Sequence, residues 1–340
     1  MIEALSEALR PGWDAFVREH PQGTFFHLSG WAKVNEQALR HKTHYLLHRR
    51  NGEISGVLPL TEIRSRLFGH MLLSNAFCVA GGPIASSDDV RRELLDAAVK
   101  LATTLNVEYV ELKDSAVDAP GWHARADLYA GFERRIDADE AACLTQIPRK
   151  QRAVVRKSLE MGLTHTIDET SQRVYDLYAR TVRDHGTPVF PRGLFDSLAS
   201  TFGRDCEVLT VCKDGEPISS VMSFYFRDRV LPYYTGSLSK ARDLGSNDFM
   251  YWRLMRRAVE RGASVFDFGR SKVGTGPFSF KKNWGFPARP ITHAFHLVRG
   301  TELPNLNPTN PKFHLLVNAW QRLPLAVANV IGPMLSRNLG

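Results

Sequence analysis

The strand before residue 270 and the segment near residue 280 combine side chains suited to moving an acyl group onto an amine. Lys281 can place an ammonium against a carbonyl oxygen or a phosphate as negative charge develops there. Asp267 can bind or deprotonate the incoming amine, and Arg270 offers a planar fork for a carboxylate or phosphate. Direct attack on a thioester or ester needs positioning, a proton acceptor and oxyanion stabilisation. These three residues are therefore the candidate catalytic cluster.

Each member of this cluster also has a purely structural interpretation. Lys282 is the rival of Lys281, since neighbouring residues on a strand face opposite ways and at most one of them points inward. A solvated lysine pair is the alternative. Asp267 and Arg270 can equally form an ion pair that fixes the loop. No covalent nucleophile is expected, because the Gly269–Val273 segment lacks the final glycine of a G-x-S-x-G elbow.

Two segments are candidates for binding an anionic donor. The residues Arg242, Gly245, Ser246 and Asn247 precede an expected long helix, whose first N–H groups can bind pyrophosphate or can simply be capped. A basic helix is expected from Pro148, with Arg149, Arg152 and Arg156 on one face. That face suits the phosphates of tRNA, of a nucleotide carrier or of an anionic membrane, and a solvated hinge helix is the alternative.

Three further residues are candidates for contacting the substrate. His185 follows an expected helix in a Gly-Thr-Pro turn, and its titration near neutrality suits a base for an ammonium acceptor. Tyr233 and Tyr234 alternate across a strand, so one of them, taken as Tyr234, lines the cleft while the other packs. Trp284 helps to decide which face of its segment is turned inward.

Histidines and cysteines do not predict a metal centre. An expected strand turns His44 and His48, near His41, to one face, and no carboxylate is expected nearby. The four cysteines form no CxxC pair and are expected to be reduced thiols. We therefore expect no metal and no tightly bound cofactor.

An internal repeat positions these residues, since each half of the chain has the same order of elements. The first copy comprises strands 44–49 and 54–62, an apolar run 71–79, a helix 89–105 and a strand 107–112. The second comprises strands 207–212, 218–226 and 230–234, a helix 248–261 and a strand 265–268. Asn51-Gly52 and Asp214-Gly215 mark the two hairpin turns. Hairpins plus a strand–helix–strand crossover predict mixed sheets.

The expected domain limits follow from this repeat. Residues 1–145 form the first domain, 146–165 the basic connecting helix, 166–300 the second domain, and 301–340 a proline-rich linker with an amphipathic tail. Pro324 divides the tail into two short helical pieces. The tail is expected to pack back on the first domain, with contact to a membrane surface as the alternative.

Bulk properties agree with a folded enzyme that binds anions. The chain has 340 residues, 43% of them hydrophobic, and a net charge of +8, which favours anionic partners. The first ten residues lack the pattern of a signal peptide, and no run approaches the roughly 20 apolar residues of a membrane span. We expect a cytoplasmic protein, and peripheral association with the inner face of the membrane is the further option.

Several segments together resemble the FemAB-related branch of the GNAT superfamily, including the subgroup associated with exosortase and PEP-CTERM protein sorting. The resemblance runs through nearly the whole chain and rests on the segments Gly23–His27 with Trp31, Pro148–Lys157, His185–Pro188, Tyr234–Ser237, Phe266–Ser271 and Gly274–Gly285. It implies an α+β fold of two tandem GNAT-like domains with mixed sheets flanked by helices. It also implies an N-acyltransferase or aminoacyltransferase of EC class 2.3, acting in cell envelope biogenesis.

The resemblance leaves the donor open among acyl-CoA, an acyl carrier thioester and aminoacyl-tRNA. The coenzyme A pattern R/Q-x-x-G-x-G/A is broken, since Asn247 takes the place of its last small residue. An amine is the expected acceptor. The alternative to an enzyme is a non-catalytic scaffold or binding module of an envelope, exopolysaccharide or protein-sorting system.

Overall fold

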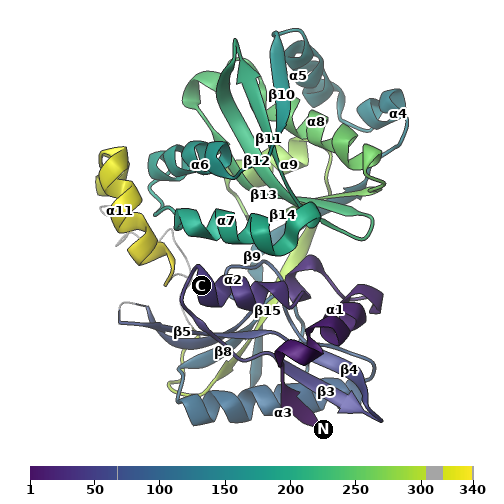
Figure 1. The fold of residues 1–340 in the computed structure, drawn as a ribbon, viewed down its shortest axis with the longest axis vertical. Coiled ribbons are helices and arrows are strands. Elements are labelled where there is room, and N and C mark those ends of the chain that lie inside the picture. The colour runs from purple at the N-terminus through teal and green to yellow at the C-terminus, as the bar shows by residue number, and fades with distance from the viewer. Residues whose placement is uncertain (67, 304–316, 339–340) are drawn as a thin grey trace. The chain divides into compact units, whose positions relative to one another are not determined.

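The computed structural model describes residues 1–66, 68–303 and 317–338, which fall into two compact units (Figure 1). Unit 1 contains Met1–Leu128, Ile291–Asn307 and Arg337–Gly340, and unit 2 contains Tyr129–Pro290 and Pro308–Ser336. These limits differ from those expected at residues 145 and 300. The chain changes unit within two long strands that the repeat did not reveal, β9 (Trp122–Arg135) and β15 (Ala288–Leu297).

Unit 2 is built on a mixed sheet in which the first five strands lie side by side in their sequence order. Its strands, in spatial order, are β10 (Leu163–Asp168), β11 (Cys206–Lys213), β12 (Glu216–Phe226), β13 (Arg229–Ser237), β14 (Val265–Lys272) and the later part of β9. All neighbours are antiparallel except β13 and β14. The helices of this unit are α4 (Glu140–Thr145), α5 (Arg149–Leu159), α6 (Gln172–Asp184), α7 (Arg192–Phe202), α8 (Ser246–Glu260), α9 (Gly276–Asn283) and α11 (Leu325–Ser336).

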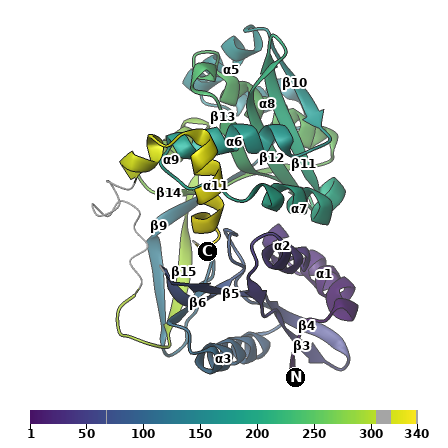
Figure 2. The same cartoon turned by 60° about the vertical axis from the view of Figure 1, so that its left-hand side comes forward.

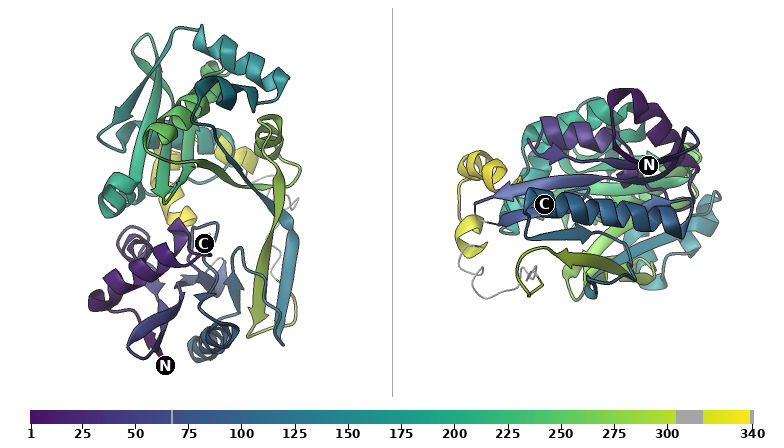
Figure 3. Two further views of the ribbon diagram at one scale, coloured as in Figure 1. Left: turned by 90° about the vertical axis from the view of Figure 1, so that its right-hand side faces the viewer. Right: turned by 90° about the horizontal axis from the view of Figure 1, so that it is seen from below.

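Unit 1 divides its strands between two sheets. One sheet has the order β1 (Ile2–Ala4), β3 (Leu46–Arg50), β4 (Glu53–Leu58), β7 (Ile84–Ala85). The other runs β15, β8 (Tyr109–Leu112), β6 (Gly69–Ser74), β5 (Leu60–Ser65), β2 (Lys42–Thr43). The helices are α1 (Arg10–Glu19), α2 (Gly30–Gln37) and α3 (Asp88–Leu105). Helix α3 contacts strands of both sheets, and Figure 3 shows this blue helix from two directions.

The predicted repeat and the predicted α+β class with mixed sheets are confirmed. Both hairpin turns have the positive φ angles of a type I′ turn: 54° and 87° at Asn51-Gly52, 52° and 82° at Asp214-Gly215. Each unit also contains a strand–helix–strand crossover whose two strands pair in parallel, β6–α3–β8 and β13–α8–β14. The two halves therefore share this arrangement of elements.

The first copy departs from the second where one strand was expected over residues 54–62. The structure has two strands there, β4 and β5, which belong to different sheets and are separated by Pro59. Proline has no N–H to donate to a ladder, so it favours a break between strands. The hairpin β3–β4 thus leaves the main sheet of unit 1, whereas its counterpart β11–β12 stays in the sheet of unit 2.

Helix α8 packs on the sheet of unit 2 through apolar residues spaced four apart. Met250, Leu254 and Ala258 are buried there. The N-cap of α8 is Gly245, at φ 63°, while Ser246 lies in the first turn and shares a hydrogen bond with Ser219. Glycine suits this left-handed position because it has no Cβ.

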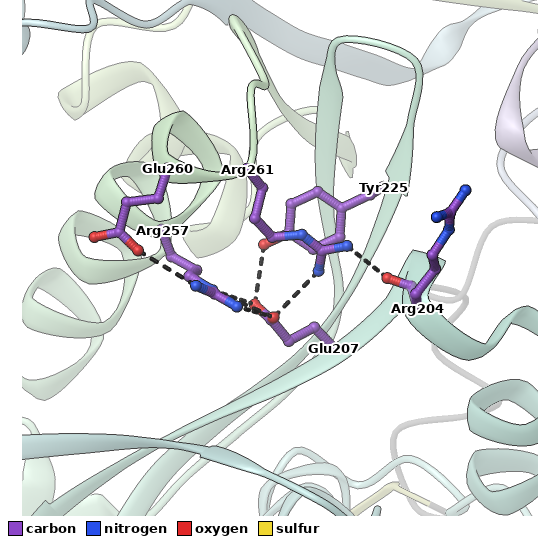
Figure 4. A network of polar contacts seen from close by, with 6 residues as sticks. All are labelled: Arg204, Glu207, Tyr225, Arg257, Glu260 and Arg261. Carbon is purple, nitrogen blue, oxygen red and sulfur yellow. Dashed lines mark hydrogen bonds and ion pairs between the residues drawn. The ribbon is translucent and has the colours of Figure 1, made fainter.

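A polar network fixes the end of α8 against β11 (Figure 4). The Glu207 carboxylate accepts hydrogen bonds from Arg257 at 3.0 Å, from Arg261 at 3.1 Å and from the Tyr225 hydroxyl at 3.1 Å. The Arg261 guanidinium also lies 3.6 Å from the centre of the Tyr225 ring. Because Glu207 is largely buried, its charge depends on these donors. The network therefore joins α8 to β11 and β12.

The C-terminal helix contradicts the expectation that the tail packs on the first domain. Helix α11 begins directly after Pro324, as predicted, but it belongs to unit 2 and packs beside α6 (Figure 2). The Ser336 hydroxyl donates to the Val189 carbonyl oxygen at 2.9 Å, because small residues let this helix approach the chain closely. The expected linker over residues 303–311 lies almost entirely outside the described residues.

Candidate active site

A β-bulge in β14 determines where the candidate catalytic residues point. Asp267 is opposite Glu133 of β9, whereas Arg270 is opposite Gly131, so β14 has one residue more than its partner. Gly269 lies in the bulge with φ 65°. An extra residue shifts the alternation of side chains by one position, so residues three apart turn toward the same face. Asp267 and Arg270 therefore share one face of the sheet.

Lys281 lies on a helix, so the expectation that it sits on a strand was wrong. It occupies the last turn of α9, where its side chain is half-buried and that of Lys282 is exposed. The Lys281 Nζ atom donates to the carbonyl oxygens of Phe268 at 2.6 Å and Arg270 at 2.9 Å. Burial lowers the pKa of this lysine to about 8, against the opposing effect of Asp267. The ammonium thus holds the bulge of β14.

A continuous hydrogen-bond chain connects Lys281 with Asp267. The Phe268 carbonyl that accepts from Lys281 belongs to the same peptide group as the Gly269 N–H. That N–H donates to Asp267 Oδ1 at 2.8 Å. Hydrogen bonds in a chain polarise one another, so the lysine charge strengthens the bond to the carboxylate. Lys281 therefore acts on Asp267 through the backbone.

The Asp267 carboxyl titrates close to neutrality. Burial raises its pKa to about 6, and the nearby Glu133 adds to this, while the Gly269 N–H, Arg229 and Lys281 oppose it. Glu133 and Arg229 form an ion pair of their own, with an N–O distance of 2.5 Å. Both were missed in the sequence, because they lie on the strands flanking β14 and neither occurs in a motif. The repeat alone gave no signal for β9.

The ion pair between Arg270 and Asp267, given above as the structural alternative, is not formed. Its guanidinium lies 4.4 Å from the centre of the Tyr129 ring, on the strand next to β14. A guanidinium stacked on an aromatic ring keeps its N–H edges available for an anion. The geometry thus leaves Arg270 able to bind a carboxylate or phosphate on the face that Asp267 shares.

The start of α8, expected to bind pyrophosphate, is packed against α5. A Cβ at Gly245 would lie 3.1 Å from the Ser158 side chain and 3.9 Å from the Val154 carbonyl oxygen. Asp248, in the first turn, accepts hydrogen bonds from Gln151 and from the Trp284 indole. A carboxylate there already occupies the positive end of the helix dipole. This terminus is therefore poorly suited to an anionic ligand, although Arg242 is exposed and Asn247 is half-buried.

The basic helix predicted from Pro148 is confirmed as α5, and it borders a groove of about 430 Å³. The groove is lined by Arg149, Arg152, Ala153, Arg156, Lys157 and Glu160. Four cations face one carboxylate there, which favours an anionic ligand. Pro148, at the start of α5, packs closely against Gly285, two residues after α9, where an added Cβ would lie 2.8 Å from the proline ring.

The three remaining candidates do not meet at this site. His185 is exposed and follows the last turn of α6. Tyr234 is buried and packs edge-on against Tyr178. Its ring centre also lies 5.0 Å from that of Phe195. Trp284 is fully buried, and its indole N–H is bonded to Asp248. The structure thus places the two aromatic residues in the core, where apolar burial accounts for them.

The expectation of histidines without a neighbouring carboxylate was wrong. His44 Nε2 lies 3.1 Å from Glu62 Oε2, and His48 Nε2 lies 3.3 Å from Glu93 Oε2, because sheet pairing and α3 bring distant carboxylates to them.

Among the described residues no group of three or more metal-ligating side chains is suitably placed for an ion. In the same part of the chain, no helix has the length and apolar character needed to cross a bilayer.

The candidate site lies in a segment of the chain that matches a known domain family. Residues 143–282 match the acetyltransferase (GNAT) domain model. The crystal structure of FemX superposes with a TM-score of 0.69 at 16% identity, covering 87% of this chain and 97% of that one. L-PGS from Bacillus licheniformis gives a TM-score of 0.54 at 14% identity and 97% coverage of both chains.

A tandem GNAT protein of the clavulanic acid biosynthesis pathway gives a TM-score of 0.52 at 12% identity, covering 89% of this chain and 99% of that one. No curated protein sequence matches the chain. Identities this low establish a shared fold. The expected resemblance to FemAB-related GNAT proteins is confirmed at the level of the fold, while the PEP-CTERM subgroup stays a prediction. The GNAT domain supports a transferase with an acyl donor and an amine acceptor.

Proposed function

Since the chain is a GNAT-domain protein with the fold of FemX, we propose that it transfers an acyl or aminoacyl group from an activated, phosphate-bearing carrier to an amine by direct attack. The observation that supports this best is the bulge of β14. It presents Asp267 and Arg270 on one face and connects the carboxylate through hydrogen bonds to Lys281. A proton acceptor and an anion clamp are the groups that amine attack requires.

Each residue has a defined part in this proposal. Asp267, with a pKa of about 6, is mostly ionised at neutral pH and accepts a proton from the attacking amine. Arg270 binds an anionic group of donor or acceptor through its planar fork. Lys281 is a positioning residue, since its ammonium is bonded to strand carbonyls and acts on Asp267 through the peptide group. The carrier leaves with the electron pair of the broken ester or thioester bond.

The structure favours a carrier with several phosphates over binding of one pyrophosphate at α8. The start of α8 is packed against α5, whereas α5 offers Arg149, Arg152 and Arg156 along an open groove. Eleven helical residues span about 16 Å, enough for several successive phosphates of a polynucleotide. Aminoacyl-tRNA is therefore our first choice of donor, and acyl-CoA or an acyl carrier thioester is the alternative.

A labelled-donor assay tests this choice. Purified protein is given a mixture of amine acceptors and either tRNA charged with a labelled amino acid or labelled acetyl-CoA, and formation of labelled amide is followed with and without RNase. For a tRNA donor we expect RNase to abolish transfer. We also expect the Arg149→Gln, Arg152→Gln, Arg156→Gln variant to lower the slope of activity against log salt by about 2 to 3, since each phosphate contact contributes close to one.

One control variant and two further outcomes complete this test. The Arg92→Gln variant removes an exposed cation from α3 of unit 1 that does not line the groove, and it should leave the salt slope unchanged. Transfer from acetyl-CoA that resists RNase would assign the donor to the thioester class. Absence of amide from both donors, with the protein folded, would contradict the proposed reaction for these carriers.

A further inference from the structure

Helix α11 exposes large apolar side chains along one face. Val327, Val330, Ile331 and Met334 are 40%, 70%, 40% and 63% exposed. Their spacing of three and four residues places them on a single stripe of the helix. No charged residue occurs anywhere in α11. Single exposed apolar residues are ordinary on a protein surface, but four on one helical stripe form a contiguous apolar ridge.

The opposite face of α11 explains why this ridge points outward. The inward residues Ala328, Gly332 and Ser336 are buried and small, and they recur every four positions. A Cβ at Gly332 would lie 2.9 Å from the Val189 backbone nitrogen, so no side chain fits between the helix and this segment. Rotating α11 to bury its large residues would force them into that contact. The close approach therefore fixes the ridge in an exposed orientation.

The charge pattern around α11 is one-sided. From Leu303 to the end of the sequence the charged residues are Lys312, Arg322 and Arg337, and neither aspartate nor glutamate occurs. Arg322 is exposed three residues before the helix begins, and Arg337 follows its last residue. The acidic residue Asp184 lies near this segment, since its backbone carbonyl accepts a hydrogen bond from the Gln321 side chain. Its carboxylate forms an ion pair with Arg183 at 2.8 Å. The apolar ridge thus has an exposed basic side chain, Arg322, before it and a half-buried one, Arg337, after it.

We propose that the exposed face of α11 binds the surface of an anionic phospholipid bilayer. A helix with one apolar stripe and basic flanks lies in the plane of the headgroups, with its apolar side chains in the acyl boundary. Each nearby cation adds attraction to an anionic surface. At 12 residues α11 is too short to span a bilayer, and it has no aromatic or arginine anchor of the kind that dominates protein interfaces. Lipid matches these features better than a protein partner.

Vesicle flotation of the full chain tests this surface. Wild-type protein is mixed with vesicles of phosphatidylcholine containing about one third phosphatidylglycerol, and with vesicles of phosphatidylcholine alone. We expect flotation with the anionic vesicles, and a loss of about tenfold or more in apparent binding for Val330→Gln combined with Met334→Gln. Ile167→Gln, which replaces a 41% exposed apolar residue on β10, is the matched control and should bind like wild type.

The outcomes separate lipid from the other possible occupants. Thermal unfolding by circular dichroism checks that each variant is folded, which is expected because glutamine is tolerated on an exposed helical face. Folded wild type that ignores anionic vesicles, or a double variant that floats as well as wild type, would overturn the proposal. A wild-type dimer that the double variant converts to a monomer, without vesicle binding, would instead assign the ridge to a second copy of the chain.

Discussion

The carboxylate of Asp267 and the ammonium of Lys281 influence one another without direct contact between their side chains. Lys281 approaches β14 from α9 and lies 5.5 Å from the centre of the Phe132 ring, while Asp267 belongs to the face occupied by Glu133. The peptide group between Phe268 and Gly269 connects them. Burial moves both pKa values toward neutrality, to about 6 and about 8. Groups tuned in this way are typical of sites that transfer protons.

Replacing Asp267 by asparagine should change how stability depends on pH. The pKa of Asp267 is raised from 3.8 to about 6, so the folded chain prefers its protonated form, and the stabilisation present below pH 4 is lost as pH rises through 6. Wild type should therefore lose about 1 to 3 kcal/mol relative to Asp267→Asn over this interval. Urea unfolding at several pH values measures it. With the exposed Asp243→Asn control the difference should stay flat; a flat difference for Asp267→Asn would contradict the assignment.

At the scale of single residues, the sequence indicated which residues could do chemistry better than it indicated where their side chains point. The structure brings Lys281, Asp267 and Arg270 close together on a bulged strand and the helix that follows it, and their part in catalysis stays a prediction. The sharing of one face by Asp267 and Arg270 depended on the bulge, which a sequence pattern does not show beyond the presence of Gly269. Tyr234 and Trp284 were assigned to the substrate because aromatic residues suit both a cleft and a core, and only burial distinguishes the two.

Helix α8 is positioned by a hydrogen-bonded carboxylate at each end. Glu207 joins its last turn to β11, and Asp248 joins its first turn to α5 and to Trp284. Tyr251, between these ends, packs against Phe268 of the bulged strand, with ring centres 4.8 Å apart. Displacement of α8 would therefore be transmitted to β14 and to the candidate site.

Removing the charge of Glu207 should destabilise unit 2 through α8. Glu207→Gln leaves two guanidinium groups with a weaker acceptor near the sheet, at a cost of about 2 to 4 kcal/mol. Glu260→Gln is the matched control, since Glu260 contacts the same Arg257 at 3.4 Å from an exposed position. We expect that variant to stay within about 0.5 kcal/mol of wild type. Urea unfolding gives both values, and equal costs for the two variants would contradict the role of the network.

Element prediction was accurate where periodicity was long and failed where the element was short. Helices α3, α5 and α8 were predicted with limits within a few residues, because each has repeated apolar positions or clustered charges. Helix α9 spans eight residues and was taken for a strand, although Pro277 in its first turn is a start signal. Strands β9 and β15 lacked hairpin turns on both sides and were not recognised.

The whole chain is organised as two copies of one plan, and this organisation was visible in the sequence. The matching hairpin turns and crossover helices predicted it, and both are present. The limits of the units were not visible, because β9 and β15 each belong partly to one unit and partly to the other. A landmark of the second copy, Gly236, is explained by packing: a Cβ there would lie 2.2 Å from the Tyr178 backbone nitrogen of α6.

The two lysines of α9 give the most direct test of the proposed enzyme. Lys281→Met removes the ammonium that holds the bulge, and Lys282→Met removes its exposed neighbour. The two variants make the same chemical change at adjacent positions, so a difference between them reports on the position alone. Once a donor and acceptor are identified, steady-state transfer is measured from about pH 5 to pH 9 for both variants. Circular dichroism confirms that each variant is folded.

We predict that Lys282→Met keeps the wild-type profile, with a rise near pH 6 as Asp267 ionises and a fall near pH 8 as Lys281 loses its proton. Lys281→Met should lower kcat by about 100-fold or more and lose the fall near pH 8. Folded Lys281→Met that retains wild-type kcat and the same alkaline limb would contradict acyl transfer at this site.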